Sequence, residues 1–260
     1  MIRNLSTKSN PCIVHAPGPK WNQNLHRDQN PLWEKIVGRF FSLPSREVVI
    51  PDELTIITFN SSLEESVLER SAKKNGIKLS VLGRGTTQWI NTLKISLASD
   101  FLDAVRTKFV LILDSNDVII TDIPKNILSM FESKAVFGAE KVFWPQCGNL
   151  TSESEKIQSD LNPDSPYKFL NAGTVLGKTE FLKRYYDDLR KIDVDDLIEM
   201  GSLSTSHELP RSSLIGSEQL RHQCAFEKHR SHIQIDSECK LFQVTVFHKE
   251  GELIFEPKML

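Results

Sequence analysis

Two carboxylates directly follow the most apolar stretch of the chain. Residues 108–113 (KFVLIL) lead into Asp114, Ser115, Asn116 and Asp117. An unbroken apolar run of this length predicts a strand buried on both faces, as in a parallel sheet covered by helices. Ligands of such sheets bind beyond the carboxyl ends of the strands. Paired acids there suit a hard divalent cation that carries a diphosphate, whereas D-x-x-D on its own is equally typical of an Asx-turn with solvated acids.

A second group of candidate residues lies near the start of the chain. The sequence I-V-H-A-P-G-P-K contains His15, Gly18 and Lys20. The glycine allows close backbone approach to a ligand, and the lysine can contact an anion. A lone loop histidine is usually only exposed, but a neutral imidazole with two carboxylates makes a good Mn²⁺ site, softer than an all-oxygen Mg²⁺ cage. We therefore predict that His15, Asp114 and Asp117 bind Mn²⁺ or Mg²⁺.

Composition narrows the function classes. The chain has 260 residues and a formal net charge of -2, which gives no electrostatic argument for nucleic acid or an anionic membrane. It has no apolar run of transmembrane length and no signal-peptide core, so we expect a cytoplasmic location. The absence of G-x-G-x-x-G and P-loop sequences argues against dinucleotide enzymes and P-loop NTPases. Scattered cysteines indicate neither a zinc site nor a disulfide framework: Cys12, Cys147, Cys224 and Cys239.

Strand and helix patterns alternate from Leu54 onward and predict an α/β fold with a mostly parallel, doubly wound central sheet flanked by helices. The predicted strands are 54–59, 77–82, 108–113, 135–139, 172–177 and 233–236, and the predicted helices are 62–75, with Ser62 as N-cap, 92–105, 124–131, 179–189 and 218–228. The remaining predictions are an irregular region at 1–50, a surface loop at 152–166, a mobile excursion at 194–213 and a hairpin at 244–255.

Several segments resemble, in order, the motifs of one family. They are LTIITF (54–59), LILDSNDV (111–118), VFGAE with FWP (136–145), FLNAGTVLG (169–177), SEQ (217–219) and ID with CKLFQ (235–243). These segments are similar to the glycosyltransferase domain of the procollagen lysyl hydroxylases and their bacterial and viral relatives. That family has L-F-x-D-S-Y-D-V, V-F-S-A-E-x-x-x-W-P, Y-L-N-S-G-G-F-I-G, D-D-Q and L-D-x-x-C-x-I-F-Q. The resemblance implies the GT-A fold of nucleotide-diphospho-sugar transferases.

The chain departs from the family in two places. The family's histidine loop, H-G-N-G-P-T-K, follows the F-Q segment, whereas His15 precedes the first strand and its loop is one residue shorter. We interpret this as a circular permutation or a rearranged terminus, because the chain ends of a compact domain lie at its surface and are often close. His248 is the alternative ligand, nearer the family position but without Gly-Pro-Lys. Glu218 stands where the family has an aspartate.

The resemblance implies roles for individual residues. The metal ligands would be His15, Asp114 and Asp117, and the catalytic residues Glu218 and Asn171, with Glu218 acting as an acceptor-side base or an electrostatic stabiliser. Acceptor-side contacts would come from Trp144 and Gln219. The donor and nucleotide would contact Gly18, Lys20, Thr58, Phe59, Asn60, Lys94, Asp114, Ser115, Asn171, Ala172 and Gly173.

The sequence thus predicts a metal-dependent glycosyltransferase with a nucleotide sugar, expected to be a UDP-sugar, as donor. It would transfer a hexose, with retention, to a hydroxyl of a glycan, protein or small molecule. The alternative is a catalytically degenerate module that binds nucleotide or glycan, or a scaffold domain. A nucleotidyltransferase would need a Gly-rich basic loop after the first strand, which is lacking. We expect one domain over residues 1–260, with the histidine loop in 1–50, a nucleotide-binding half at 54–140 and an acceptor and donor-sugar half at 141–260. We expect no nucleic-acid partner. The oligomeric state stays open.

Overall fold

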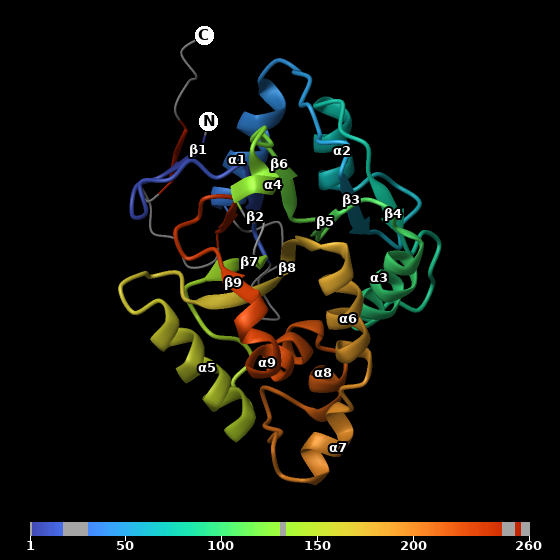
Figure 1. Cartoon of the computed structure of the whole chain (residues 1–260), viewed down its shortest axis with the longest axis vertical. Coiled ribbons are helices and arrows are strands. Elements are labelled where there is room, and N and C mark those ends of the chain that lie inside the picture. Colours follow the sequence, from blue (N-terminus) through green and yellow to red (C-terminus); the bar gives the residue numbers. More distant parts are fainter. Residues whose placement is uncertain (1, 18–30, 131–133, 246–252, 256–260) are drawn as a thin grey trace.

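A computed structural model describes residues 2–17, 31–130, 134–245 and 253–255 (Figure 1). The fold is mixed α/β, as predicted, with a largely parallel six-stranded sheet between helices, consistent with a GT-A-like nucleotide-sugar transferase. The strand order is β4-β3-β5-β8-β7-β9. The pairs β4–β3, β3–β5 and β7–β9 are parallel, and β8 is antiparallel to both of its neighbours. The strand bounds are β3 Leu54–Phe59, β4 Ser80–Leu82, β5 Phe109–Leu113, β7 Ala135–Glu140, β8 Phe169–Lys178 and β9 Ile233–Ile235.

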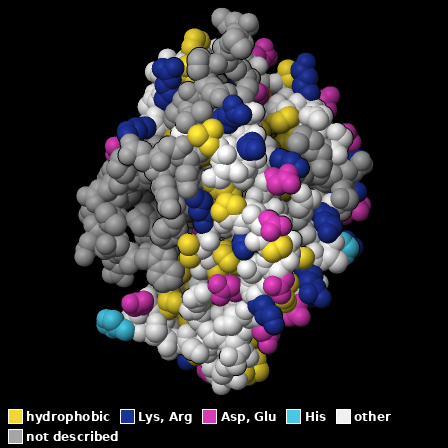
Figure 2. Space-filling model, turned by 90° about the vertical axis from the view of Figure 1, so that its left-hand side faces the viewer, with side chains coloured by type: hydrophobic (Ala, Val, Ile, Leu, Met, Phe, Trp, Pro, Cys, Tyr) yellow, Lys and Arg dark blue, Asp and Glu magenta, His cyan; other side chains and the backbone are white. Residues whose placement is uncertain are grey.

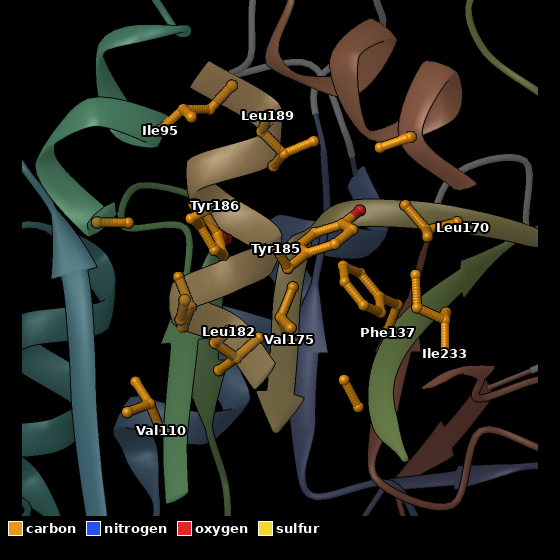
Figure 3. Close-up of a cluster of buried hydrophobic side chains, with 14 of the residues drawn as sticks. Ile95, Val110, Phe137, Leu170, Val175, Leu182, Tyr185, Tyr186, Leu189 and Ile233 are labelled. Carbon is orange, nitrogen blue, oxygen red and sulfur yellow. The ribbon is translucent and has the colours of Figure 1, made fainter. Parts of the chain in front are cut away.

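Both faces of this sheet are covered, which explains why β5 is apolar at every position. Val110 and Ile112 point to one core cluster, whereas Phe109, Leu111 and Leu113 point to another. The first cluster lies under α3 (Leu93–Ala104), α6 (Thr179–Arg190) and α9 (Glu218–His229). Figure 3 shows side chains of α6 packed against Val110 and Val175 of the sheet. Leu68 and Ala72 of α2 (Val67–Lys74) belong to the second cluster.

A smaller sheet joins distant parts of the chain beside the second cluster. Its strand order is β10 (Phe242–Val244), β2 (Ile13–His15) and β6 (Val118–Ile120). The strand β2 is parallel to β10 and antiparallel to β6. A two-stranded ribbon pairs β1 (Ile2–Asn4) with β11 (Leu253–Phe255). Together with α1 (Pro31–Ser42), these strands correct the prediction that residues 1–50 are irregular.

Other sequence-based predictions need correction. Residues 149–161 form helix α5 (Asn149–Leu161), not a loop, because its polar residues Ser154 and Gln158 are buried and hydrogen-bonded to Gln223. The strands β10 and β11 pair with different partners, so they do not form the predicted hairpin, whose turn lies outside the described residues. Helix α2 begins after Ser66, whose side chain accepts a hydrogen bond from Glu69 N, rather than after Ser62.

The excursion at 194–213 contains α7 (Val194–Glu199) and α8 (Arg211–Ile215), which pack on their own apolar cluster. The short elements α4 (Ile127–Met130) and a 3-10 helix (Arg230–His232) complete the described structure. Among the described helices, none is both long and apolar enough to cross a membrane. Acidic and basic side chains are interspersed on the face shown in Figure 2, as the small net charge implies.

Candidate metal centre and adjoining pocket

The turn at residues 114–117 joins the two larger sheets. Strand β5 ends at Leu113 in the central sheet, and β6 begins at Val118 in the three-stranded sheet. Backbone hydrogen bonds fix both ends of the turn: Asp114 N donates to Gly173 O at 2.8 Å, and Ala16 N donates to Asp117 O at 2.8 Å. The two carboxylates are therefore held at the junction of the sheets by backbone pairing.

The ladder between β2 and β6 brings His15 to this turn, opposite Val118. The imidazole is 1% exposed, and its Nε2 lies 3.6 Å from Asp114 Oδ2 and 3.7 Å from Asp117 Oδ1. These distances are too long for hydrogen bonds, and Nε2 is buried without a hydrogen bond to any described residue. One imidazole nitrogen and two carboxylate oxygens, within 4.8 Å of one another, fit a divalent cation as ligands.

Gly173 allows strand β8 to approach Asp114 and His15 closely. A Cβ at this position would lie 2.7 Å from Asp114 Oδ2 and would also collide with the His15 ring. The neighbouring Asn171 of β8 contacts the other side of His15, with 2.9 Å between His15 Nδ1 and Asn171 Oδ1. Only a glycine at position 173 therefore leaves the carboxylate and the imidazole in place.

A lysine whose side chain is only 12% exposed links the acid pair to Glu218. Lys94, in the first turn of α3, contacts Asp114 Oδ1 and lies 2.9 Å from Glu218 Oε2. Burial lowers the pKa of Lys94, but the two carboxylates outweigh burial and hold that pKa above its usual value. Lys94 is therefore a cation, and it neutralises part of the negative charge gathered here.

Glu218 begins helix α9 and is buried against a second histidine. The N-cap Ser217 accepts a hydrogen bond from Leu220 N, which fixes the start of the helix. His222 Nε2 lies 3.9 Å from Glu218 Oε1, and His222 Nδ1 lies 2.9 Å from the Tyr185 hydroxyl. Burial and the Lys94 charge lower the pKa of His222 to about 3, so this imidazole is neutral.

A pocket of about 750 Å³ lies over these groups. The predicted site residues that line it are His15, Phe59, Asn60, Lys94, Asp114, Ser115, Asp117, Trp144, Asn171, Ala172, Gly173, Glu218 and Gln219. Thr58 is fully buried and lies outside this lining. Gln219 accepts from Ala172 N and donates to Leu170 O, so its amide holds β8 against α9. The predicted residues Gly18 and Lys20, and the alternative ligand His248, lie outside the described residues.

Sequence reasoning gave no role to three residues here. Trp89 lines the pocket, and its ring lies over Gly83, where an added Cβ would be 2.7 Å from it. Glu140 ends strand β7 and contacts Asn171. The rule that drew attention to Asp114, an acid at the end of an apolar strand, also applies to Glu140. An aromatic residue in a loop after a strand could have indicated Trp89, whereas nothing in the sequence distinguishes His222 from a core histidine.

A sheet of this topology, with a polar pocket beside its strand ends, is consistent with the fold of a nucleotide-sugar transferase. A family model for the PLOD GT domain matches residues 51–197, which is more than half of the chain. The chain belongs to this family of glycosyltransferase domains related to lysyl hydroxylase. A search of curated proteins found no match.

Proposed function

We propose that this protein is a metal-dependent hexosyltransferase that uses a UDP-sugar donor and a hydroxyl acceptor, with retention at the anomeric carbon. The observation that carries the proposal is the buried Nε2 of His15, which faces Asp114 and Asp117 at the edge of a large pocket. The imidazole favours Mn²⁺ over Mg²⁺. The rearranged N-terminal position of His15 is part of this proposal.

The leaving group of such a transfer is a nucleoside diphosphate. A cation held by His15, Asp114 and Asp117 would neutralise the charge that develops on it. In this proposal residues 54–140 bind the nucleotide, with Phe59 and Asn60 at the end of β3. Asn60 donates to Glu69 Oε2 at 2.6 Å and accepts from Ser62 N at 2.9 Å, which fixes the loop that follows the strand.

We assign Glu218 the electrostatic role rather than the role of base. Its carboxylate is 7% exposed, lines the pocket and is already paired with the Lys94 ammonium. An anionic carboxylate beside the donor sugar stabilises the positive charge of an oxocarbenium-like transition state. Trp144 provides a flat apolar face for the acceptor, and Gln219 supports that side through β8.

The proposal is tested by thermal unfolding with a panel of nucleoside diphosphates, each with Mn²⁺ and with EDTA. A ligand at 100 times its Kd adds about 2.7 kcal/mol to the free energy of unfolding, which raises Tm by roughly 5–10 °C in a chain of this size. We expect this shift for UDP with Mn²⁺ and not with EDTA. An equal shift in EDTA, or none for any nucleotide, would refute metal-dependent nucleotide binding.

A second arm tests transfer and its stereochemistry. The protein with Mn²⁺ and a UDP-hexose is incubated with simple hydroxyl acceptors, and the anomeric proton of the product is followed by NMR. We expect slow release of UDP and a product that keeps the donor's anomeric configuration. Nucleotide binding without UDP release under any condition would instead indicate the degenerate module, and an inverted product would contradict retention alone.

A further inference from the structure

A buried chain of hydrogen bonds leads from Glu140 through Asn171 to His15. Asn171 Nδ2 donates to Glu140 Oε1, and Asn171 Oδ1 lies 2.9 Å from both Gly173 N and His15 Nδ1. The exposed fractions of Glu140, Asn171 and His15 are 6%, 1% and 1%. Because water is largely excluded, these contacts decide how each polar group is oriented.

The orientation of the Asn171 amide is fixed by two independent neighbours. A carboxylate only accepts hydrogen bonds, so Glu140 must face the amide NH₂. The backbone N–H of Gly173 only donates, so it must face the amide oxygen. Both constraints place Asn171 Oδ1, an acceptor, opposite His15 Nδ1. The proton of a neutral His15 ring is therefore on Nδ1.

This tautomer leaves the lone pair of His15 Nε2 directed at the two aspartates. The lone pair and the oxygens of Asp114 and Asp117 then form three electron donors that face one another at 3.6 and 3.7 Å. Donors in this arrangement repel one another unless a cation lies among them. A metal-ligating histidine commonly donates its other N–H to an oxygen in this way, which fixes the ring and its basicity.

We propose that Asn171 and Glu140 are positioning residues of the metal site, which hold His15 in the tautomer and ring orientation that bind a divalent cation. This proposal rests on the metal site of the proposed function. It adds a role to the expected contact of Asn171 with the donor sugar, because the amide oxygen and one amide N–H already have partners within the protein.

The test measures Mn²⁺ affinity without nucleotide, from the EPR signal of free Mn²⁺ during titration. We expect Glu140→Ala, which removes the acceptor for Asn171 Nδ2, and Asn171→Ala to weaken Mn²⁺ binding by roughly 10- to 100-fold, the usual scale for a partner that orients a metal ligand. The double variant Glu140→Gln with Asn171→Asp exchanges donor and acceptor at that link and keeps an oxygen opposite His15 Nδ1. It should bind Mn²⁺ within about threefold of the wild type on the same reasoning.

Glu69→Ala is the matched control, because Glu69 makes the same carboxylate-to-asparagine contact with Asn60. It should leave Mn²⁺ affinity unchanged, and metal-free melting of each variant reports on folding separately. Single variants that fold and bind Mn²⁺ as the wild type does would overturn the proposal. A raised KM for the UDP-sugar at unchanged Mn²⁺ affinity would overturn it as well. A wild type that binds no Mn²⁺ would instead refute the metal site itself.

Discussion

The pocket has two walls of different construction. The metal corner is made of β2, β5, β6 and β8, whose backbones are held by ladders between buried strands. A second wall, called the acceptor wall after its proposed role, includes Ser213, within the five-residue helix α8, and Gly216, which follows that helix; both lie beyond residue 197, where the family match ends. Under the proposed function, donor chemistry is assigned to the paired strands of the metal corner and acceptor choice to the short helices of the other wall.

The ion pairs beside the acceptor wall are exposed, whereas the strands of the metal corner are buried. Around α7 and α8, Arg211 pairs with Asp195 at 2.5 Å and with Glu199 at 3.0 Å, but all three side chains are exposed. Exposed ion pairs of this kind contribute little to stability. The acceptor wall is therefore held by its apolar cluster rather than by these ion pairs.

Asp114→Asn should have the largest effect, because it removes a charge that faces both His15 and Lys94. We expect loss of all Mn²⁺-dependent UDP binding by calorimetry with the fold retained, and the same result for Asp117→Asn. Asp122→Asn is the control, since that carboxylate pairs with Arg46 at the surface at 2.7 Å. If Asp114→Asn binds UDP with undiminished affinity, the metal corner takes no part in binding the donor.

Glu218→Gln should lower turnover by roughly 10²-fold or more, the range for removing an oppositely charged group near a transition state. UDP affinity should stay nearly unchanged, because the side chain acts on the sugar rather than on the nucleotide. Initial rates and calorimetry separate the two quantities, and the exposed Glu199→Gln is the control. Unaltered turnover would show that Glu218 only stabilises the N-terminus of α9.

His15→Ala should weaken Mn²⁺–UDP binding by at least roughly tenfold, since loss of an outer-shell partner alone commonly costs that much. His248→Ala tests the alternative ligand at the family's usual chain position and should change binding far less. Both are measured by Mn²⁺ and UDP titration. The reverse ranking would show that the usual C-terminal ligand has been kept.

Ser213→Phe should act on the acceptor wall only. A bulky side chain in the pocket should raise the acceptor KM by about tenfold, the scale of a clash of 1–2 kcal/mol, with Mn²⁺–UDP affinity unchanged. Ser212→Phe is the matched control, because Ser212 is exposed one residue away and does not line the pocket. A parallel loss of UDP affinity would show that the two walls are coupled.

The last expected effect is on stability alone and concerns the buried His222. Its pKa is about 3 when folded and 6.5 in the reference state, so at intermediate pH the unfolded chain binds the extra proton. Stability is therefore full above pH 6.5 and falls with acidification, by about 2 kcal/mol between pH 7.5 and 5. Urea melts should show this additional slope in the wild type and not in His222→Asn. Equal slopes would contradict the neutral buried imidazole.

The sequence predicted the strands of the central sheet well, because burial on both faces makes β5 apolar throughout and β3 nearly so. It mispredicted α5, whose buried polar face looks like a surface pattern. The nearness of His15 to the acid pair was expected from chemistry alone, and the structure places them together. The contact between Glu140 and Asn171 could not be predicted, because it depends on a register shift between β7 and β8.

The most direct measurement is the anomalous difference map of a crystal grown with Mn²⁺ and UDP, recorded near the manganese absorption edge. The account predicts one strong peak between His15 Nε2 and the carboxylates of Asp114 and Asp117, with the diphosphate of UDP on its pocket side. A peak liganded by His248 in place of His15, or density for UDP with no manganese peak at the two aspartates, would contradict it.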